Sequence, residues 1–171
     1  MVIDWRLPMV TIRPAEQADL DRITEIYNEA VRTTTATFDT ELRSAQEQRA
    51  WFDAHGERHP VLVADYEGTI AGWTALSRWH DRAGYRDTAE TSFYVAEAYR
   101  GKGIGRALKS AIIEEARRLG YHTLIALVAE GSEASLHLNE SFGFRRVGIL
   151  REVGAKFGRR LDVHIMQKLL G

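Results

Sequence analysis

The sequence predicts an α/β (α+β) domain with a mixed, mostly antiparallel central sheet flanked by helices. Strand-like alternation and helix-like periodicity succeed one another in the order β-α-α-β-β-β-α-β-α-β-β. This order contains one strand–helix–strand crossover, which favours one parallel pair, and the remaining strands are close enough in sequence to form hairpins. The 171 residues suit a single domain, and they contain no internal repeat or low-complexity linker.

The first half of the chain predicts a short strand, two helices and a hairpin. The strand Val10–Arg13 ends at Pro14, and a helix begins near Asp19. The apolar residues of that helix fall on one stripe: Leu20, Ile23, Tyr27, Ala30 and Val31. The threonine-rich segment 33–37 should end the helix, because its β-branched side chains favour a loop. Ser44 and Glu47 then have capping-box spacing and open a second helix. Next, Glu67-Gly68 separates two strands as a hairpin turn: Val61–Tyr66 and Ile70–Trp79.

The second half continues with a polar and aromatic loop at Trp79–Asp87 and a strand at Thr88–Val95. A helix follows at Ile104–Leu119, and Gly120 is its stop signal. After a strand at Thr123–Val128, Ser132 is in position to cap a short helix that ends before Gly143. The last hairpin is predicted to turn around Gly158-Arg159-Arg160, between the following strands: Phe144–Val153 and Asp162–Leu169.

Composition excludes several functional classes. The 23 basic and 24 acidic residues nearly balance, which argues against nucleic-acid or membrane partners. The chain has no cysteine, so a disulfide, a thiolate metal site and a cysteine nucleophile are excluded. Its six histidines form no tight ligand pair with carboxylates, and we expect no metal. Residues 1–9 lack a signal-peptide pattern and form an N-terminal extension, so we expect a cytoplasmic protein whose single domain spans residues 10–171.

The strongest local motif lies between the strand ending at Val95 and the helix starting at Ile104. Glycines 101, 103 and 105 allow close backbone approach and positive φ. The first N–H groups of a helix have no internal partners, and the helix dipole places positive charge there. This geometry suits a pyrophosphate, and Arg100, Lys102 and Arg106 add cationic side chains.

Three other interpretations of this loop compete. A dinucleotide fold needs Gly-x-Gly-x-x-Gly and repeated crossovers, whereas position 106 is Arg and one crossover is predicted. A nucleoside-triphosphate loop needs Gly-Lys-Ser/Thr after its spacer, which is absent. A glycine-rich turn that merely caps a helix remains open on the glycines alone.

The motif Arg-x-x-Gly-x-Gly between a strand and a helix resembles the coenzyme A loop of the GNAT N-acetyltransferase superfamily. From about Thr11 to Leu169 the chain is most similar to the phosphinothricin / methionine sulfone N-acetyltransferase family. The matching segments are Ile26–Val31, Ala50–Phe52, Glu90–Val95, Ala134-Ser135, Gly143-Phe144 and Val153–Arg159. The resemblance implies the GNAT fold, with the sheet splayed where the coenzyme enters between strands that end near Val95 and Val128. It also implies acetyl-CoA as co-substrate and a homodimer.

The resemblance assigns roles to individual residues. The strand residues Phe93, Tyr94 and Val95 would lie along the pantetheine arm, and the segment Arg100, Gly101, Lys102, Gly103, Ile104, Gly105 and Arg106 would hold the pyrophosphate. Glu90 would be the general base, because only a neutral amine has a lone pair that can attack a thioester. A buried or salt-bridged structural glutamate is the alternative.

The departing thiolate is usually protonated in this family by a Tyr or a His on the helix before Gly-Phe. Asn139 occupies that position here, and an amide is no proton acid near neutral pH. His137 is two residues away and turned about 200° around the helix, so it is a poor substitute. Ser132 stands where the family often has an Asn that contacts the coenzyme, although its simplest role is an N-cap.

The resemblance places the acyl acceptor over the 79–87 loop. Its contacts would be His80, Asp81, Arg82, Tyr85, Glu90, Thr91 and Ser92, with Arg86 nearby and with Phe38 and Glu41 closing the other side. We expect an acetyl-CoA-dependent N-acetyltransferase acting on a small amino-acid-like amine. A protein or peptide N-terminal acetyltransferase and a non-catalytic acetyl-CoA-binding sensor are the alternatives.

Overall fold

The computed structural model describes residues 10–171, so the predicted extension 1–9 lies outside the described residues. Seven strands form one sheet in the order β1-β2-β3-β4-β5-β7-β6, and every neighbouring pair is antiparallel except β4–β5. The strands are β1 Val10–Pro14, β2 Val61–Tyr66, β3 Thr69–Arg78, β4 Thr88–Val95, β5 Thr123–Ala129, β6 Arg145–Lys156 and β7 Arg159–Leu169. The expected mixed, mostly antiparallel sheet with one parallel pair is confirmed.

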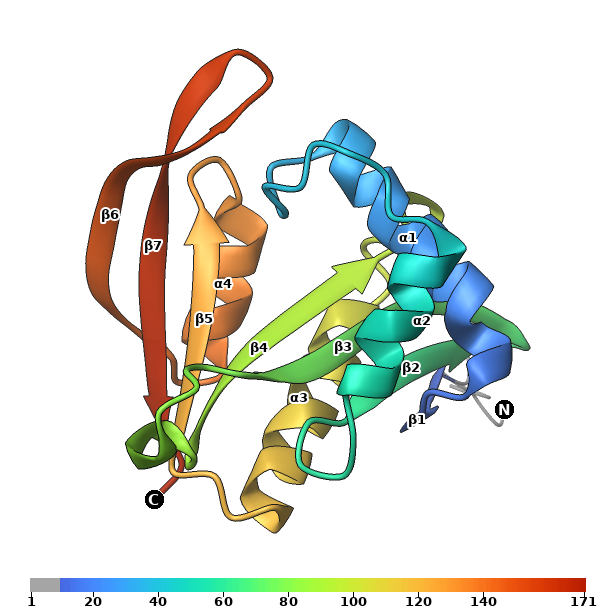
Figure 1. Cartoon of the computed structure of the whole chain (residues 1–171), viewed down its shortest axis with the longest axis horizontal. Coiled ribbons are helices and arrows are strands. Elements are labelled where there is room, and N and C mark those ends of the chain that lie inside the picture. The colour runs from blue at the N-terminus through green and yellow to red at the C-terminus, as the bar shows by residue number, and fades with distance from the viewer. Residues whose placement is uncertain (1–9) are drawn as a thin grey trace, which may run out of the picture.

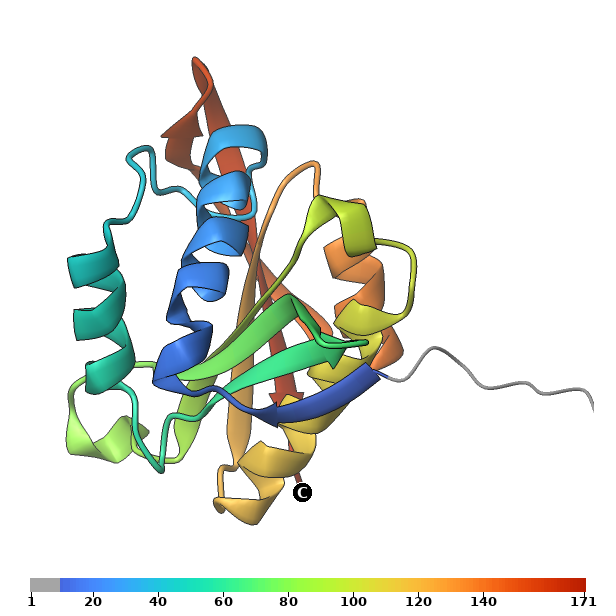
Figure 2. The same ribbon diagram turned by 90° about the vertical axis from the view of Figure 1, so that its right-hand side faces the viewer.

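Two layers of helices enclose this sheet. The helices are α1 Leu20–Thr33, α2 Ala45–Ala54, α3 Ile104–Arg118 and α4 Glu133–Ser141. Helices α1 and α2 lie on one face of the sheet, and α3 and α4 lie on the other (Figure 2). No helix in the described range is both long and apolar enough to cross a membrane.

Each face of the sheet has its own apolar core. On the α1 side, Ile23 and Ile26 pack with Val63 and Trp73. On the α3 side, Ile112 packs in a cluster drawn from several elements, which includes Leu76, Ala89, Leu124, Leu136, Phe144 and Met166. Because β3 is buried on both faces, its sequence is a nearly continuous apolar run and does not alternate between apolar and polar residues.

Local signals place several element ends as the sequence predicted. The hydroxyl of Ser44 accepts from the N–H of Glu47, and the Glu47 carboxylate accepts from the N–H of Ser44, which completes the capping box. The strand β1 ends at Pro14, which is itself the last paired residue, opposite Leu62. Proline is tolerated there because β1 is an edge strand of the sheet.

The last hairpin differs from the prediction. Its strands β6 and β7 run to Lys156 and from Arg159, so the turn is the two-residue pair Phe157-Gly158 rather than residues 158–160. Both turn residues have positive φ, 51° and 71°, as a tight hairpin turn requires. No sequence signal indicated this turn, because an aromatic residue seldom adopts positive φ.

Candidate functional site

The sheet opens between β4 and β5. The two strands pair in parallel at three positions, from Thr88 opposite Thr123 to Glu90 opposite Ile125. Beyond Glu90, β4 stays paired with β3 as far as Val95, while β5 stays paired with β7, so the two strands diverge (Figure 1). The predicted splay between these strands is therefore confirmed, and it begins directly after Glu90.

The divergence leaves one edge of β4 without a strand partner from Thr91 to Val95. An unpaired strand edge presents main-chain N–H and C=O groups. An extended ligand that carries its own amides can hydrogen-bond to such an edge as an added strand does. This edge therefore suits an arm with amide bonds, such as pantetheine.

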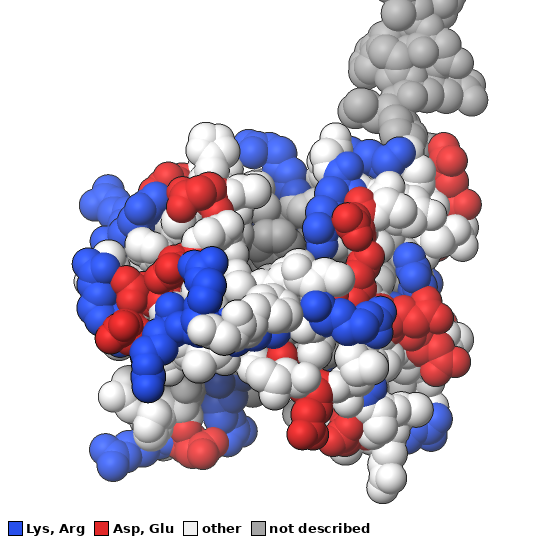
Figure 3. Space-filling model, turned by 90° about the horizontal axis from the view of Figure 1, so that it is seen from above, with Lys and Arg blue, Asp and Glu red and all other residues white. Residues whose placement is uncertain are grey.

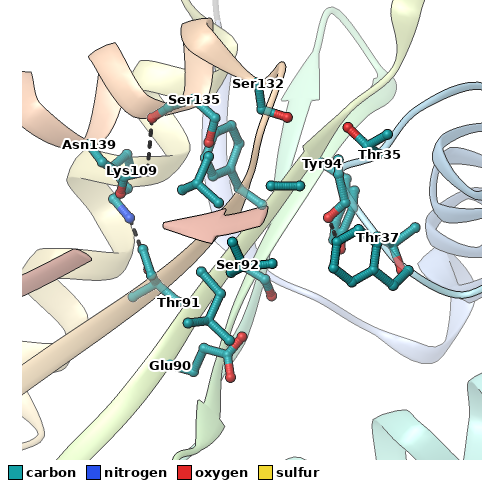
Figure 4. Close-up of a pocket in the computed structure, with 18 residues that line it drawn as sticks. Thr35, Thr37, Glu90, Thr91, Ser92, Tyr94, Lys109, Ser132, Ser135 and Asn139 are labelled. Carbon is teal, nitrogen blue, oxygen red and sulfur yellow. Dashed lines mark hydrogen bonds between the residues drawn. The ribbon is translucent and has the colours of Figure 1, made fainter. Parts of the chain in front are cut away.

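A cavity of about 270 Å³ occupies the opening (Figure 4). It is walled by β4, β5, the loop after α1, and helices α3 and α4. The lining residues are Thr35–Phe38, Glu90–Tyr94, Lys109, Ala126–Ala129, Ser132, Ser135, Asn139 and Val163. The expected contribution of Phe38 to the pocket is present, whereas Glu41 lies outside this cavity in a separate surface depression.

The cavity reaches both faces of the sheet, because successive side chains of a strand point to opposite faces. On one face, Tyr94 packs edge-on against Tyr27 of α1, with ring centroids 5.2 Å apart. On the other face, Thr91 accepts a hydrogen bond from Lys109 of α3. Glu90 alternates with Thr91 and therefore belongs to the α1 face. A ligand in the opening can thus meet different side chains on its two sides.

Glu90 is partly buried at the narrow end of the opening. Burial raises its pKa above the usual glutamate value, and no charge contributes to the shift. Within residues 10–171 no cation forms an ion pair with this carboxylate, so the alternative of a salt-bridged structural glutamate finds no support there. A carboxylate that faces a cavity with a raised pKa is suited to accept a proton.

A second cavity, of about 420 Å³, runs along the glycine loop. Gly103 is the N-cap of α3 with φ +79°, Gly101 has φ +74°, and no side chain caps this helix start. Val95, Phe93 and Tyr94 line this groove together with loop residues: Tyr99, Arg100, Gly101, Gly103, Ile104 and Gly105. The groove and the Glu90 cavity share lining residues, namely Ala36, Phe93, Tyr94, Ser132 and Ser135. The two spaces are therefore contiguous.

The three basic residues of the loop are not equivalent. Arg100 lines the groove, and its Nε donates to the carbonyl of Val95 at 3.4 Å. Lys102 instead lies over the ring of Tyr66, and Arg106 donates to the hydroxyl of Ser141 at 3.2 Å. The chain wraps around the helix start, so these neighbouring side chains point in different directions. Of the three, Arg100 lines the groove, and the expected role of all three in holding the pyrophosphate stays a prediction.

Helix α4 forms a wall of both cavities. Asn139 is 1% exposed, and its Nδ2 donates to the carbonyl of Ser135 at 2.9 Å. Its Oδ1 is buried without a hydrogen-bond partner among the described residues. Ser132 is the N-cap residue by position, but its hydroxyl makes no capping bond, so the predicted side-chain cap is wrong. That hydroxyl lines both cavities instead.

The structure separates the predicted acceptor residues into two groups. Thr91 and Ser92 line the cavity with Glu90. The loop residues do not, and they surround a different hollow of about 540 Å³ that includes His80, Asp81, Arg82, Tyr85 and Arg86. That hollow borders Thr88, where β4 and β5 are still paired, so intact sheet separates it from the opening.

Sequence reasoning missed Lys109. Its Nζ donates to Thr91 Oγ1 at 2.9 Å, and the side chain is 1% exposed (Figure 4). Burial lowers its pKa to about 7. A signal was present, because Lys109 lies three and four residues before Ile112 and Ile113, on the buried stripe of α3. A lysine on an apolar helical stripe is unusual unless it has a partner.

Within residues 10–171, no three His, Asp or Glu side chains are grouped so that they could hold a metal ion. The reactive groups that line the cavity are the Glu90 carboxylate, the Lys109 amine, several Ser and Thr hydroxyls and the unpaired edge of β4. These groups can bind an amide-bearing ligand and transfer protons.

Comparison with known proteins gives the family. Residues 12–165 match the profile described as an acetyltransferase (GNAT) domain. The chain is 41% identical over 159 residues to L-amino acid N-acyltransferase MnaT of Escherichia coli (strain K12), covering 92% of each protein. A phosphinothricin acetyltransferase from Sinorhizobium meliloti, solved in complex with AcCoA, superposes with a TM-score of 0.92 at 36% identity, over 95% of this chain and 89% of that one.

A third similar protein was solved as a ribosomal-protein-alanine N-acetyltransferase from Brucella melitensis. Its TM-score is 0.91 at 41% identity, over 93% of this chain and 99% of that one. The seven-stranded sheet splayed beside a glycine loop, the family profile and these similarities agree. This chain therefore belongs to the GNAT acetyltransferase family and is an N-acetyltransferase with acetyl-CoA as its co-substrate.

Proposed function

We propose that the chain transfers the acetyl group of acetyl-CoA directly to the amine of a small amino acid or analogue, such as phosphinothricin or methionine sulfone. The observation that carries this proposal is the continuity of the glycine-loop groove with the Glu90 cavity. A coenzyme in the groove can extend its arm along the free edge of β4. The cavity of about 270 Å³ beyond suits a small acceptor.

Glu90 is the proposed general base. The acceptor amine attacks the thioester carbonyl only after losing a proton, and Glu90 is the carboxylate that lines the cavity. The free main-chain N–H groups of β4 supply the donors that stabilise the oxyanion formed during attack. Both substrates are bound at once, and no cysteine is present to carry the acetyl group.

We assign the remaining contacts by cavity. Arg100 and the helix start at Gly103–Gly105 hold the phosphates, and Phe93, Tyr94 and Val95 line the arm. Ser92 and Phe38 contact the acceptor on the Glu90 side, and Thr91 faces the thioester from the Lys109 side. We do not extend the acceptor site to His80, Asp81, Arg82 and Tyr85, because they border a separate hollow.

The alternative acceptor is a peptide N-terminus, which the name of the Brucella melitensis protein raises. A peptide would need an open path out of the cavity for its chain. Phe38 and the threonine-rich loop instead line the cavity on that side, and this supports a free amino acid.

The test is acetyl-CoA turnover, followed as release of coenzyme A, with a panel of amines. The panel contains methionine sulfone, phosphinothricin, ordinary L-amino acids and a peptide that begins with alanine. The proposal expects the highest kcat/KM on a small amino acid or analogue. Preference for the peptide would favour the alternative, and tight acetyl-CoA binding without turnover on any amine would favour a sensor.

We further propose that residues 10–171 act as one domain in a cytoplasmic homodimer. The edge strand β6 supports the dimer, because it exposes apolar side chains: Val147, Ile149, Leu150 and Val153. Light scattering of the chain and of a Val147→Asp/Val153→Asp variant tests it, since the variant should be monomeric.

Acidic and basic side chains are interspersed on the face seen in Figure 3, which supports a small-molecule acceptor and neither nucleic acid nor membrane as a partner.

A further inference from the structure

We propose that Lys109 is the proton donor to the sulfur that leaves acetyl-CoA. The inference rests on the proposed function and adds a catalytic residue to it. Asn139 lines the cavity from helix α4, but its amide cannot supply a proton near neutral pH. The amine of Lys109, on the neighbouring helix α3, can supply one.

The first argument is position. Lys109 and Asn139 both line the cavity from the α3 and α4 face of the sheet, whereas Glu90 lies on the α1 face (Figure 4). Acetyl transfer needs a base beside the incoming nitrogen and an acid beside the outgoing sulfur. These two atoms lie on different sides of the reacting carbonyl carbon. A thioester in the opening between β4 and β5 therefore has Glu90 on one side and Lys109 on the other.

The second argument is unmet hydrogen bonding. An ammonium group has three donors. Among the described residues Lys109 has one hydrogen-bond acceptor, Thr91 Oγ1 at 2.9 Å, and the ring of Phe144 at 4.0 Å. Asn139 Oδ1 is buried in the same wall and accepts from no described residue. Buried polar groups are nearly always paired, so these two groups indicate that a polar ligand completes the site.

The third argument is electrostatic. Burial lowers the pKa of Lys109 to about 7, so near neutral pH its proton is far more easily given up than that of a surface lysine. The titratable side chains that share the cavity are Glu90 and Tyr94, and both belong to the opposite face of β4. On the Lys109 side the described walls are otherwise uncharged: Thr91, Ser135, Asn139 and Phe144.

The protons balance as follows. Glu90 takes one proton from the acceptor ammonium before attack, and the nitrogen releases its second proton to solvent as the nitrogen–carbon bond forms. As the carbon–sulfur bond breaks, its electron pair goes to sulfur, and the Lys109 ammonium gives sulfur a proton. Coenzyme A leaves as the thiol, Glu90 is then protonated and Lys109 is neutral. Transfer of one proton from Glu90 to Lys109 through solvent restores both groups.

The test compares Lys109→Met with the unaltered chain. Methionine keeps the length and apolar stem of lysine and removes the amine. We expect kcat to fall by about 10²- to 10⁴-fold, the range that general acid catalysis supplies, with acetyl-CoA affinity retained. In the unaltered chain kcat should fall as the pH rises through the pKa of Lys109, and this falling limb should be absent from the variant. Lys168→Met, which removes an amine outside both cavities, is the matched control and should leave kcat and its pH profile unchanged.

Chemical rescue provides a second measurement. The chain has no cysteine, so Lys109→Cys can be alkylated with 2-bromoethylamine in denaturant and refolded, which places an amine at this position alone. The proposal expects the alkylated protein to regain kcat and the falling limb. A structural role for the ammonium would restore stability without restoring that limb.

The outcomes separate the two proposals. Normal turnover by the unaltered chain together with unchanged kcat and pH profile in Lys109→Met would overturn the role of Lys109 and leave the proposed function intact. Absence of turnover by the unaltered chain on every amine would overturn both. If neither variant folds, the unaltered chain decides, because a kcat with no falling limb above about pH 7 contradicts a donor of this kind.

Discussion

Glu90 and Ile125 are the last residues at which β4 and β5 pair in parallel. The proposed base thus stands where continuous sheet becomes an open edge. On its other edge Glu90 pairs with Ser77 of β3, so its backbone is held from both sides. The same strand is free to bind a ligand immediately afterwards. A rigid base next to a ligand-binding edge is an arrangement suited to catalysis.

Glu90→Gln should fold and bind acetyl-CoA but lose about 10²- to 10⁴-fold in kcat, because the amide cannot accept the proton of the amine. The loss of charge should not reduce stability, since burial already disfavours the carboxylate. Steady-state kinetics and thermal unfolding check both statements. Glu114→Gln, on the exposed face of α3, is the control and should keep full activity. A Glu90→Gln variant with unaltered kcat would remove Glu90 from the mechanism.

The pH dependence of kcat/KM should report the same carboxylate. Burial raises the pKa of Glu90, and the base acts in its ionised form. Activity should therefore fall as the pH drops through a pKa above the ordinary glutamate value of about 4.3. An acceptor whose amine has a pKa below that of Glu90 should be used for the profile. The acceptor is then already deprotonated, so the fall of activity at low pH reports Glu90 and not the acceptor itself. A limb at or below the ordinary value would contradict the burial argument.

Gly103→Ala should weaken acetyl-CoA binding. Gly103 starts α3 with φ +79°, a conformation that costs a residue with a side chain about 1–2 kcal/mol. Relaxation of that strain turns the helix-start N–H groups away from the phosphates. Gly68→Ala is a matched control, because Gly68 has φ +87° in the β2–β3 turn and, like Gly103, has open space around its Cβ position. Denaturant unfolding should show a similar destabilisation in both variants, whereas calorimetry should show weaker binding only in Gly103→Ala.

Gly154→Ala should raise the KM for the amine. A Cβ at Gly154 would overlap the ring of Phe38, which lines the Glu90 cavity. The ring must move, and such overpacking costs about 1–3 kcal/mol. Gly148→Ala, in the same strand β6, is the control, since its Cβ would meet Ile165 at an ordinary 3.9 Å. Equal KM values for the amine in both variants would show that Phe38 does not shape the acceptor site.

Asp19→Asn should destabilise the fold by about 1–3 kcal/mol at neutral pH. The Asp19 carboxylate accepts two bonds from Arg13, at 2.7 and 2.9 Å, and one from the N–H of Glu16. The bond from Arg13 holds the pKa of Asp19 below its usual value. A lowered folded pKa means that the stabilisation is complete above the unfolded value of about 3.9 and is lost as the pH falls through the folded pKa. The difference in unfolding free energy between the two proteins should therefore shrink below about pH 4. Asp53→Asn, an exposed site, should show no such dependence.

The sequence by itself determined the order and type of the elements, because their signals act over a few residues. The Ser44–Glu47 capping box fixed the start of α2, and the glycines before Ile104 marked a helix start open to an anion. The resemblance then supplied the candidate base and coenzyme strand. The last turn was misplaced because the positive φ of Phe157 has no local signature.

The tertiary structure alone decided which of these residues meet. It brought Lys109 to Thr91 and Phe38 to Gly154, and it placed the loop around His80 beside a separate hollow. These relationships depend on strand register, on the point at which β4 leaves β5, and on how helices pack across the sheet. The local pattern of apolar residues predicts none of these three features, because contacts between residues distant in sequence form only when whole elements pack together.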